Sequence, residues 1–408
     1  MLKKIDVRDL RLGMHLHAFE GSWVDHPFWR TRFVIDDTAV LDKVRTSGVR
    51  EVWIDASKGL DVAAPAPDLP APVRAAPPPP APAPAPPASR SMSEELHQAA
   101  AICKQAREAV SSMFADARLG KAIDAEACLP LVEQVSDSVF RNPGAMVSLA
   151  RLKTHDDYSY MHSVAVCALM VALARQLGQS VDECREAVRA GLLHDLGKAL
   201  MPLEVLNKPG KLTDDEYTLM KTHPGRGHEL LVEGGNAGPA VLEVCLHHHE
   251  KIDGTGYPHR LRDEQVSLLA RMGAVCDVYD AITSDRPYKA GWDPAESIAR
   301  MASWKGHFDP AMLAAFVKSI GIYPTGSLVR MESGRIGVVV EQTVGKPAAP
   351  VVRLFYSTKS GMPIPPVRLD LGRGDNTDRI TGREPAERWA NVKLDELWLP
   401  PEVLRASK

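Results

Sequence analysis

Histidine and aspartate side chains that could bind a metal occur in apolar parts of this chain. His194 and Asp195 follow one another at the end of the apolar run in GLLHDLGK, and three histidines begin the stretch HHHEKIDGTGYP at residues 247–258. Apolar flanks would bury these groups, and a buried carboxylate beside an imidazole needs compensation, most readily from a metal ion. A single His-Asp pair arises often by chance, so its meaning depends on further ligands elsewhere.

Further histidines and aspartates lie at helical positions with similarly apolar neighbours. Taken singly, each is better explained as a core side chain bonded to the backbone, whereas one shared dinuclear site accounts for all of them. The predicted ligand set is His162, His194, Asp195, His223, His248, His249 and Asp277. Imidazole and carboxylate together suit iron, manganese, zinc or nickel better than calcium or magnesium. The sequence therefore predicts two divalent transition-metal ions as cofactors.

Two metals that share one site could hydrolyse a phosphodiester. Asp195 is the natural bridging carboxylate for ions about 3.5–4 Å apart, with a bridging water between them. Deprotonated by both cations, that water would be a nucleophile suited to in-line attack on phosphorus. Lys198 follows His194 by about one helical turn and could neutralise the phosphate or the leaving oxygen. Asp195 and Lys198 are therefore the predicted catalytic residues.

The glycine-rich turn after the three histidines has its own requirements. Gly254 and Gly256 permit backbone turns that are closed to other residues, and Pro258 fixes the exit. We expect Asp253 to brace this loop through backbone amides. Glu250 either orients a ligand histidine or ends a helix in solvent, and both alternatives stay open.

Not every histidine of this region is expected to bind metal. Adjacent helical residues point about 100° apart, so three consecutive histidines cannot all face one centre. His247 is therefore expected to be a bystander of its two neighbours. His228 and His307 are likewise interpreted as lying outside the site.

The candidate ligands need a helical scaffold, which the sequence predicts over residues 91–324. Ser91 followed by Glu94 is typical of a helix N-terminus, and apolar residues then recur at helical spacing from Ile102 onward. Later segments, such as YMHSVAVCALMVALARQLG at 160–178, are apolar on more than one face, as in helices packed on several sides. We therefore expect an all-α core.

Composition shifts separate this helical part from its flanks. Residues 63–90 are almost wholly proline and alanine, which favours an extended, semi-rigid tether. Residues 1–62 carry two strand patterns and a capped helix pattern, so a small α+β domain is predicted, with the aromatic stretch 21–30 in its packing. Residues 325–408 carry strand-turn-strand patterns and should form a small β-rich C-terminal appendage. The predicted chain is multidomain.

Charge and cysteine usage exclude several classes of protein. The net charge of −3 supplies no basic field, which argues against general nucleic-acid binding, so an anionic ligand would need a local group of Lys and Arg. Six scattered cysteines without a C-x-x-C pair indicate a reduced compartment. The N-terminal residues lack the apolar stretch of a signal peptide, and no apolar run approaches ~18 residues. We therefore expect a cytoplasmic protein that does not enter membranes.

The motifs together resemble a known family. HDLGK followed by HHEKIDGTGYP closely resembles the HD-GYP subfamily of HD-domain phosphohydrolases, and the resemblance extends over about residues 150–320 through NKPGKLTDDE, KTHP and DVYDAITSDRPYK. It implies a cyclic di-GMP phosphodiesterase that opens its substrate to pGpG, with GMP as a possible final product, and that uses iron or manganese. The N-terminal unit is similar to the domain of uncertain role that commonly precedes HD-GYP.

The resemblance also implies roles for individual residues. The family's metal ligands fall on the seven residues named above. Lys198 matches the lysine that touches the substrate phosphate, and Arg286 and Lys289 match the basic pair that holds the other phosphate. Tyr257 lies in the loop that forms a lip over the substrate in the family. That loop, or the N-terminal domain, could also contact a protein partner, and a homodimer is possible.

One departure from the family concerns the number of metals. Some members bind a third ion through a glutamate one helical turn before the first ligand histidine, and that position here is Tyr158. We therefore predict a dinuclear centre. Two other functions stay open: a cyclic di-GMP receptor or adaptor with little turnover, and an HD hydrolase of another cyclic dinucleotide.

Overall fold

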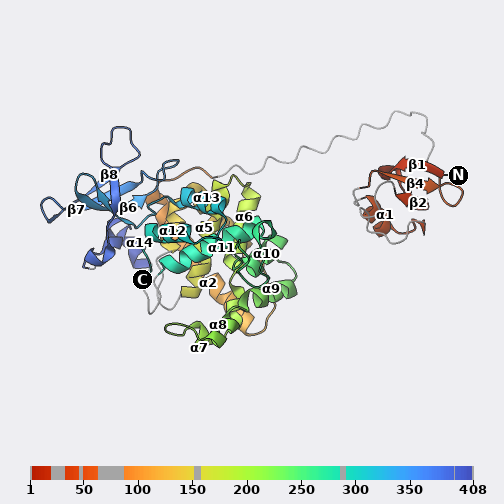
Figure 1. Ribbon diagram of the computed structural model, residues 1–408, viewed down its shortest axis with the longest axis horizontal. Coiled ribbons are helices and arrows are strands. Elements are labelled where there is room, and N and C mark those ends of the chain that lie inside the picture. The colour runs from red at the N-terminus through yellow and green to blue at the C-terminus, as the bar shows by residue number, and fades with distance from the viewer. Residues whose placement is uncertain are drawn as a thin grey trace. The chain divides into compact units, whose positions relative to one another are not determined.

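The computed structural model describes most of the 408-residue chain. The described residues are 2–19, 33–45, 49–62, 87–150, 158–284, 291–389 and 391–406. They belong to two compact units, Met1–Ala83 and Pro84–Lys408 (Figure 1).

The first unit contains a four-stranded antiparallel sheet and an α-helix. Its elements are β1 (Leu2–Asp6), η1 (Val7–Asp9), β2 (His15–Phe19), β3 (Phe33–Val34), α1 (Thr38–Arg45) and β4 (Glu51–Asp55). The strand order is β1-β4-β2-β3. Leu16 of β2 and Val52 and Ile54 of β4 share a buried core with Val44 of α1, as the strand and helix periodicities require. The sheet and helix agree with the expected α+β character, while the aromatic stretch 21–30 lies outside the described residues.

In its described residues, the second unit begins with a series of helical segments that position the candidate ligands. They are α2 (Met92–Arg118), α3 (Leu129–Arg141), α4 (Pro143–Ala150), α5 (Tyr158–Gln176), α6 (Val181–Leu193), η3 (Leu196–Leu200), α7 (Leu203–Leu206), α8 (Asp214–Met220), α9 (His223–Gly234), α10 (Pro239–His247), α11 (Leu268–Thr283), α12 (Pro294–Ser303) and α13 (Pro310–Ile320), with the short η4 (Asp263–Gln265) before α11. Ser91 and Glu94 form the expected capping box at the start of α2.

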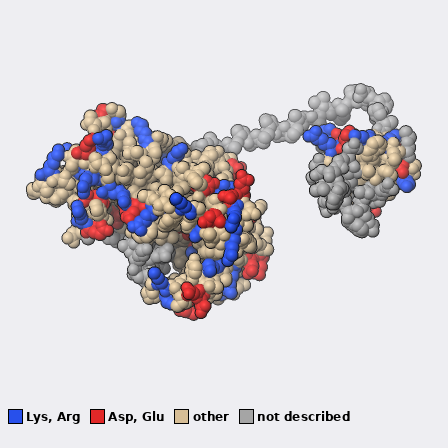
Figure 2. Space-filling model, in the orientation of Figure 1, with Lys and Arg blue, Asp and Glu red and all other residues tan. Residues whose placement is uncertain are grey.

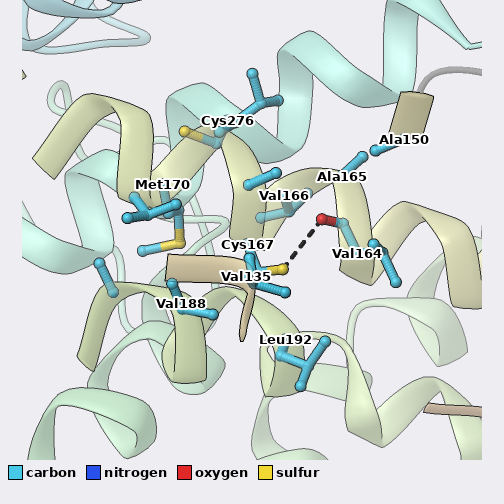
Figure 3. Close-up of a cluster of buried hydrophobic side chains, with 14 of the residues drawn as sticks. Val135, Ala150, Val164, Ala165, Val166, Cys167, Met170, Val188, Leu192 and Cys276 are labelled. Atoms are coloured by element: carbon cyan, nitrogen blue, oxygen red, sulfur yellow. Dashed lines mark hydrogen bonds between the residues drawn. The ribbon is translucent and has the colours of Figure 1, made fainter. Parts of the chain in front are cut away.

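Helix α5 lies at the centre of this helical part. Every residue from Val164 to Ala174 is buried, because α5 packs against α2, α4, α6, α11 and α13 (Figure 1). Figure 3 shows Cys167 and Met170 of α5 beside Leu192 of α6 and Cys276 of α11. This all-round burial fixes the helix axis, and with it the position of any ligand that α5 carries.

A five-stranded antiparallel sheet follows the helices. It consists of β5 (Leu328–Met331), β6 (Arg335–Glu341), β7 (Val351–Ser357), β8 (Met362–Asp370) and β9 (Ile380–Arg383), in the order β8-β7-β6-β5-β9. Three prolines in the edge strand β8 block further strand pairing. The chain ends in η5 (Ala386–Trp389), η6 (Leu394–Leu397) and α14 (Pro401–Ala406).

The all-α expectation is confirmed only in part. The helical core is present, but the unit Pro84–Lys408 also contains the five-stranded sheet and its terminal helix. Leu399 and Val403 join the main helical core, and Trp398 packs against both that core and the core of the sheet. Apolar burial therefore joins helices and sheet in one compact unit.

The surface and the cysteines agree with the composition. Positive and negative side chains are interspersed over the face shown in Figure 2, without a continuous basic field on its described part. All six cysteines are free and buried. Among the helices that the structure describes, none combines the length and apolarity needed to cross a membrane.

Candidate metal centre

Helix ends and two helix interiors bring the seven predicted ligands to one place. His194, His223 and His248 stand at the ends of α6, α9 and α10. His162 and Asp277 lie within α5 and α11, which pack against each other. The remaining two ligands directly follow a histidine of this set in the sequence. Rigid elements therefore position the whole set.

The seven side chains divide into two neighbouring groups. The first, called the His162 group, is His162, His194 and Asp277, and the second, called the His223 group, is Asp195, His223, His248 and His249. Within each group, one potential ligand atom of every residue lies within 4.8 Å of the others. Six of the seven residues are buried, and the His249 side chain is 20% exposed. Each group has the ligand spacing that could hold a metal ion.

Asp195 lies between the two groups and turns one oxygen toward each. Its Oδ2 atom is 3.4 Å from Nε2 of both His162 and His194. Its Oδ1 atom is 3.2 Å from His223 Nε2 and 3.6 Å from His248 Nε2. A carboxylate in this position can serve both groups at once.

His194 and His223 present lone pairs, rather than protons, to this interior. Nδ1 of His194 donates to the Gly191 carbonyl and Nδ1 of His223 to the Met220 carbonyl, each at 2.7 Å. Burial lowers the pKa of His194 to about 3 and also lowers the pKa of His223, so each ring is neutral and carries its one proton on Nδ1. Within the described chain, His194 Nε2 and Asp195 Oδ1 are buried without a hydrogen-bond partner.

Lone pairs that converge in this way repel one another unless a cation lies among them. The 3.2 Å approach of His223 Nε2 to Asp195 Oδ1 joins two acceptors, and so does the 3.4 Å approach of His223 Nε2 to His248 Nε2. His248 also directs Nδ1 at two main-chain carbonyls, at 3.0 Å each. The donor set therefore fits metal ions, and the side chains are already oriented to receive them.

Asp280 contacts a predicted ligand, and the sequence interpretation did not include it. His162 Nδ1 donates to Asp280 Oδ2 at 2.6 Å, and His162 Nε2 lies 2.9 Å from Asp277 Oδ1. Burial alone would lower the pKa of His162, but the hydrogen bonds to Asp277 and Asp280 raise it. The only signal in the sequence was a second aspartate three residues after Asp277, on the same helical face.

Lys198 and Tyr257 border the two groups. The Lys198 ammonium forms an ion pair with Asp195 Oδ2, and its side chain is 20% exposed. Burial would raise the pKa of Asp195, but the charge of Lys198 helps to hold it well below the usual value. The Tyr257 ring lies 4.8 Å from the His249 ring at an interplanar angle of 33°. A positive charge and an aromatic face thus flank the ligands.

Glu250 corrects one expectation, because it neither orients a ligand histidine nor ends a helix in solvent. It is buried, and its carboxylate accepts hydrogen bonds from the backbone amides of His259 at 2.6 Å and Leu261 at 3.1 Å. The expected brace at Asp253 is present, since its Oδ1 accepts from the Thr255 amide at 2.9 Å. Both acids therefore hold the glycine-rich loop.

The other histidines lie where the sequence placed them, outside both groups. His247 directs Nε2 at His259 Nδ1, 3.0 Å away, and Nδ1 at Glu243. The His307 ring stacks on Phe308 at 4.2 Å. His228 is half-buried on α9.

Three residues of the sequence interpretation are not covered by these contacts. Arg286 and Lys289, the predicted phosphate-binding pair, lie outside the described residues, and so does the side chain of Tyr158. Their roles stay predictions.

Close backbone contact holds His223, of the His223 group, against η3. A Cβ atom on Gly197 would lie 1.9 Å from the His223 carbonyl oxygen and 2.6 Å from the Gly227 amide nitrogen. Only glycine allows this approach. The first turn of α9 is therefore seated directly on η3, which immediately follows Asp195.

Comparison with known proteins places this architecture in a family. A domain of unknown function, DUF3391, matches residues 2–128, and an HD domain matches residues 133–312. The chain is 56% identical over 399 residues to the cyclic di-GMP phosphodiesterase PA4108 of Pseudomonas aeruginosa, covering 98% of this chain and 96% of that protein. The chain belongs to the HD-domain phosphodiesterase family. The HD-GYP resemblance found in the motifs is confirmed.

Two further HD-domain relatives match over shorter stretches. The cyclic di-GMP phosphodiesterase response regulator RpfG of Xanthomonas campestris is 45% identical over 148 residues, covering 36% of this chain and 39% of that protein. The 3'3'-cGAMP-specific phosphodiesterase 3 of Vibrio cholerae is 30% identical over 201 residues, covering 49% and 42%. HD-domain phosphodiesterases named for two different cyclic dinucleotides are therefore similar to this chain.

Proposed function

We propose that this protein is a metal-dependent phosphodiesterase that hydrolyses cyclic di-GMP to pGpG. In this proposal the His162 and His223 groups hold two divalent transition-metal ions, iron or manganese. The observation that carries it is the convergence of buried lone pairs on either side of Asp195. The substrate is supported by the near full-length similarity to a cyclic di-GMP phosphodiesterase.

The residues of the centre have distinct roles in this reaction. Two divalent ions in these groups would polarise the phosphodiester and acidify a bound water. Asp195 offers one oxygen to each group and would bridge them. The Lys198 ammonium can reach a phosphate oxygen or the departing 3′ oxygen, because it already borders Asp195 and is partly exposed. The Tyr257 ring covers His249 and supplies a wall for the substrate.

The remaining assignments are also part of the proposal. Arg286 and Lys289 hold the second phosphate, as the family motif implies. Residues 1–62 form the N-terminal domain, 63–90 the tether, 91–324 the catalytic domain and 325–408 the C-terminal appendage. We also propose a protein partner at the glycine-rich loop or the N-terminal domain. The protein is further proposed to form a homodimer and to be located in the cytoplasm.

Turnover of cyclic di-GMP by the full chain tests the function directly. Metal-free protein is loaded with Mn²⁺ or Fe²⁺, and formation of pGpG and GMP is followed by chromatography. We expect Asp195→Ala to abolish turnover, because it removes the carboxylate shared by both groups. The matched control is Asp182→Ala on α6, whose side chain is 91% exposed and which should retain full turnover.

The same assay separates the alternative functions. A receptor would bind cyclic di-GMP tightly but turn it over equally slowly in wild type and Asp195→Ala, and that result would refute the enzyme proposal. A hydrolase of another cyclic dinucleotide would favour 3'3'-cGAMP in direct competition. We expect cyclic di-GMP to have the higher kcat/KM.

A further inference from the structure

His162 differs from three other ligand histidines in the group that accepts its Nδ1 proton. His194, His223 and His248 each direct Nδ1 at a main-chain carbonyl three or four residues earlier. His162 instead directs Nδ1 at the carboxylate of Asp280, at 2.6 Å, and both residues are at most 3% exposed. A buried carboxylate that accepts the Nδ1 proton makes Nε2 a stronger ligand than a carbonyl acceptor does.

Asp280 is itself held in position. It lies three residues after Asp277 on α11, so the two carboxylates share a helical face. Asp280 contacts Nδ1 of the His162 ring and Asp277 contacts Nε2. The Ser284 hydroxyl donates to Asp280 Oδ1 at 3.3 Å, and the Ser284 amide donates to the Asp280 carbonyl. The ring orientation of His162 is therefore fixed, with Nδ1 directed at Asp280.

Negative charge is also distributed unequally between the groups. The His162 group contains Asp277 and has Asp280 directly behind it. Asp195 is the only carboxylate of the His223 group, but it and Asp277 each approach both groups. Asp195 Oδ2, which pairs with Lys198, lies 3.4 Å from Nε2 of His162 and of His194, and Asp277 Oδ2 lies 3.6 Å from His249 Nδ1. Asp280 is therefore the carboxylate that distinguishes the His162 group, where its charge favours a divalent cation.

We propose that the two metal positions bind their ions with unequal affinity, the His162 group more tightly, and that Asp280 is the positioning residue that sets the difference. This inference rests on the dinuclear centre of the proposed function. Loss of such an outer carboxylate typically lowers metal affinity about 10- to 100-fold. Its removal should therefore bring the affinities of the two positions together.

Titration of the metal-free full chain with Mn²⁺, followed by calorimetry and by the electron paramagnetic resonance signal of free Mn²⁺, tests the inference. Wild type should bind two ions in separate steps. Asp280→Asn keeps an oxygen acceptor for the Nδ1 proton but removes the charge, so it should weaken the tighter step about 10-fold and leave the weaker step unchanged. Asp280→Ala removes the acceptor as well and should weaken the same step further.

Two further variants control for structural damage. Asp309→Asn alters an aspartate outside the centre, which caps α13 by accepting from the Ala311 amide and pairs with Arg271, and it should leave both steps as in wild type. Ser284→Ala keeps the Asp280 carboxylate but loosens it, and should weaken the tighter step to a smaller extent. This variant tests the inference even where Asp280 substitutions fail to fold, which the melting temperature of each metal-free variant reports.

Several outcomes would overturn the inference. These are two indistinguishable steps in wild type, an unchanged tighter step in folded Asp280→Asn, or equal weakening of both steps. A single ion per wild-type chain would overturn the dinuclear centre along with it. Unequal binding of two ions without hydrolysis of cyclic di-GMP would instead refute the proposed function and leave the inequality standing.

Discussion

Replacing Gly197 with alanine should damage the metal centre without touching any ligand. The added Cβ would lie 1.9 Å from the His223 carbonyl oxygen, where ordinary van der Waals contact begins at 3.4 Å. The obstructing atoms are backbone, so no side chain can rotate away. The segment η3 and the first turn of α9 must therefore separate by roughly 1 Å or more, and His223 moves with α9.

The size of the effect follows from that displacement. His223 Nε2 is 3.2 Å from Asp195 Oδ1, so a shift of roughly 1 Å is a large fraction of the spacing between these two ligand atoms. A misplacement of about 1 Å typically costs about 100-fold in rate. Overpacking of this kind also lowers the free energy of unfolding by about 1–3 kcal/mol.

Gly225→Ala is the matched control for this change. Gly225 lies in α9, as His223 does, and a Cβ there would meet no atom within 4 Å. Alanine favours a helix over glycine by up to about 1 kcal/mol. We expect Gly197→Ala to lose turnover of cyclic di-GMP, Mn²⁺ affinity and melting temperature, while Gly225→Ala retains all three. Equal turnover and equal Mn²⁺ binding in the two variants would refute the argument that this backbone contact positions His223.

Three further predictions concern the border of the centre, the loop and the metals. Lys198→Met should lower kcat for cyclic di-GMP about 100- to 1,000-fold while metal analysis still finds two ions per chain; an unchanged kcat would rule out its role in the reaction. Glu250→Gln should raise KM and lower the melting temperature, because a neutral amide accepts more weakly from the His259 and Leu261 amides, and an unchanged KM would contradict a substrate-binding role for the loop. Removing metal with EDTA should lower the melting temperature, and Mn²⁺ at about 100 times its Kd should restore roughly 2.7 kcal/mol of stability; a melting temperature insensitive to EDTA would argue against metal at the centre.

The sequence singled out the candidate ligands because their chemistry is local. A histidine or aspartate within an apolar helical run is conspicuous wherever it occurs, and His162, His194 and Asp277 stand in such runs. The helix N-terminus at Ser91 was equally readable, since its capping box involves only the next three residues. Patterns of this kind need no knowledge of tertiary structure.

What the sequence could not show depends on contacts between distant segments. Asp280 was missed because its partner His162 is 118 residues away, and an aspartate in a helix has many other possible roles. Glu250 was misjudged because its acceptor role appears only once the chain turns back at Gly254, with a φ of 77°, and returns the His259 and Leu261 amides to it. The joining of helices and sheet in one unit likewise follows from apolar packing around Trp398.

The candidate ligands His194 and His223 and the glycine-rich loop are held by different contacts in this fold. Helix-end carbonyls orient the imidazoles of His194 and His223, and no residue of the glycine-rich loop takes part in those hydrogen bonds. The loop is held by Glu250 and by its own link to the segment before α13, where the Asp253 amide donates to the Gly306 carbonyl. Damage to the loop should therefore raise KM with a smaller loss of metal affinity, because the loop contacts the ligand His249, whose carbonyl accepts from the Tyr257 amide, but does not hold His194 or His223. Damage to η3 or α9 should instead act mainly on metal affinity, through His223. A loop variant that lost metal while its helices stayed folded would show that the two supports are coupled after all.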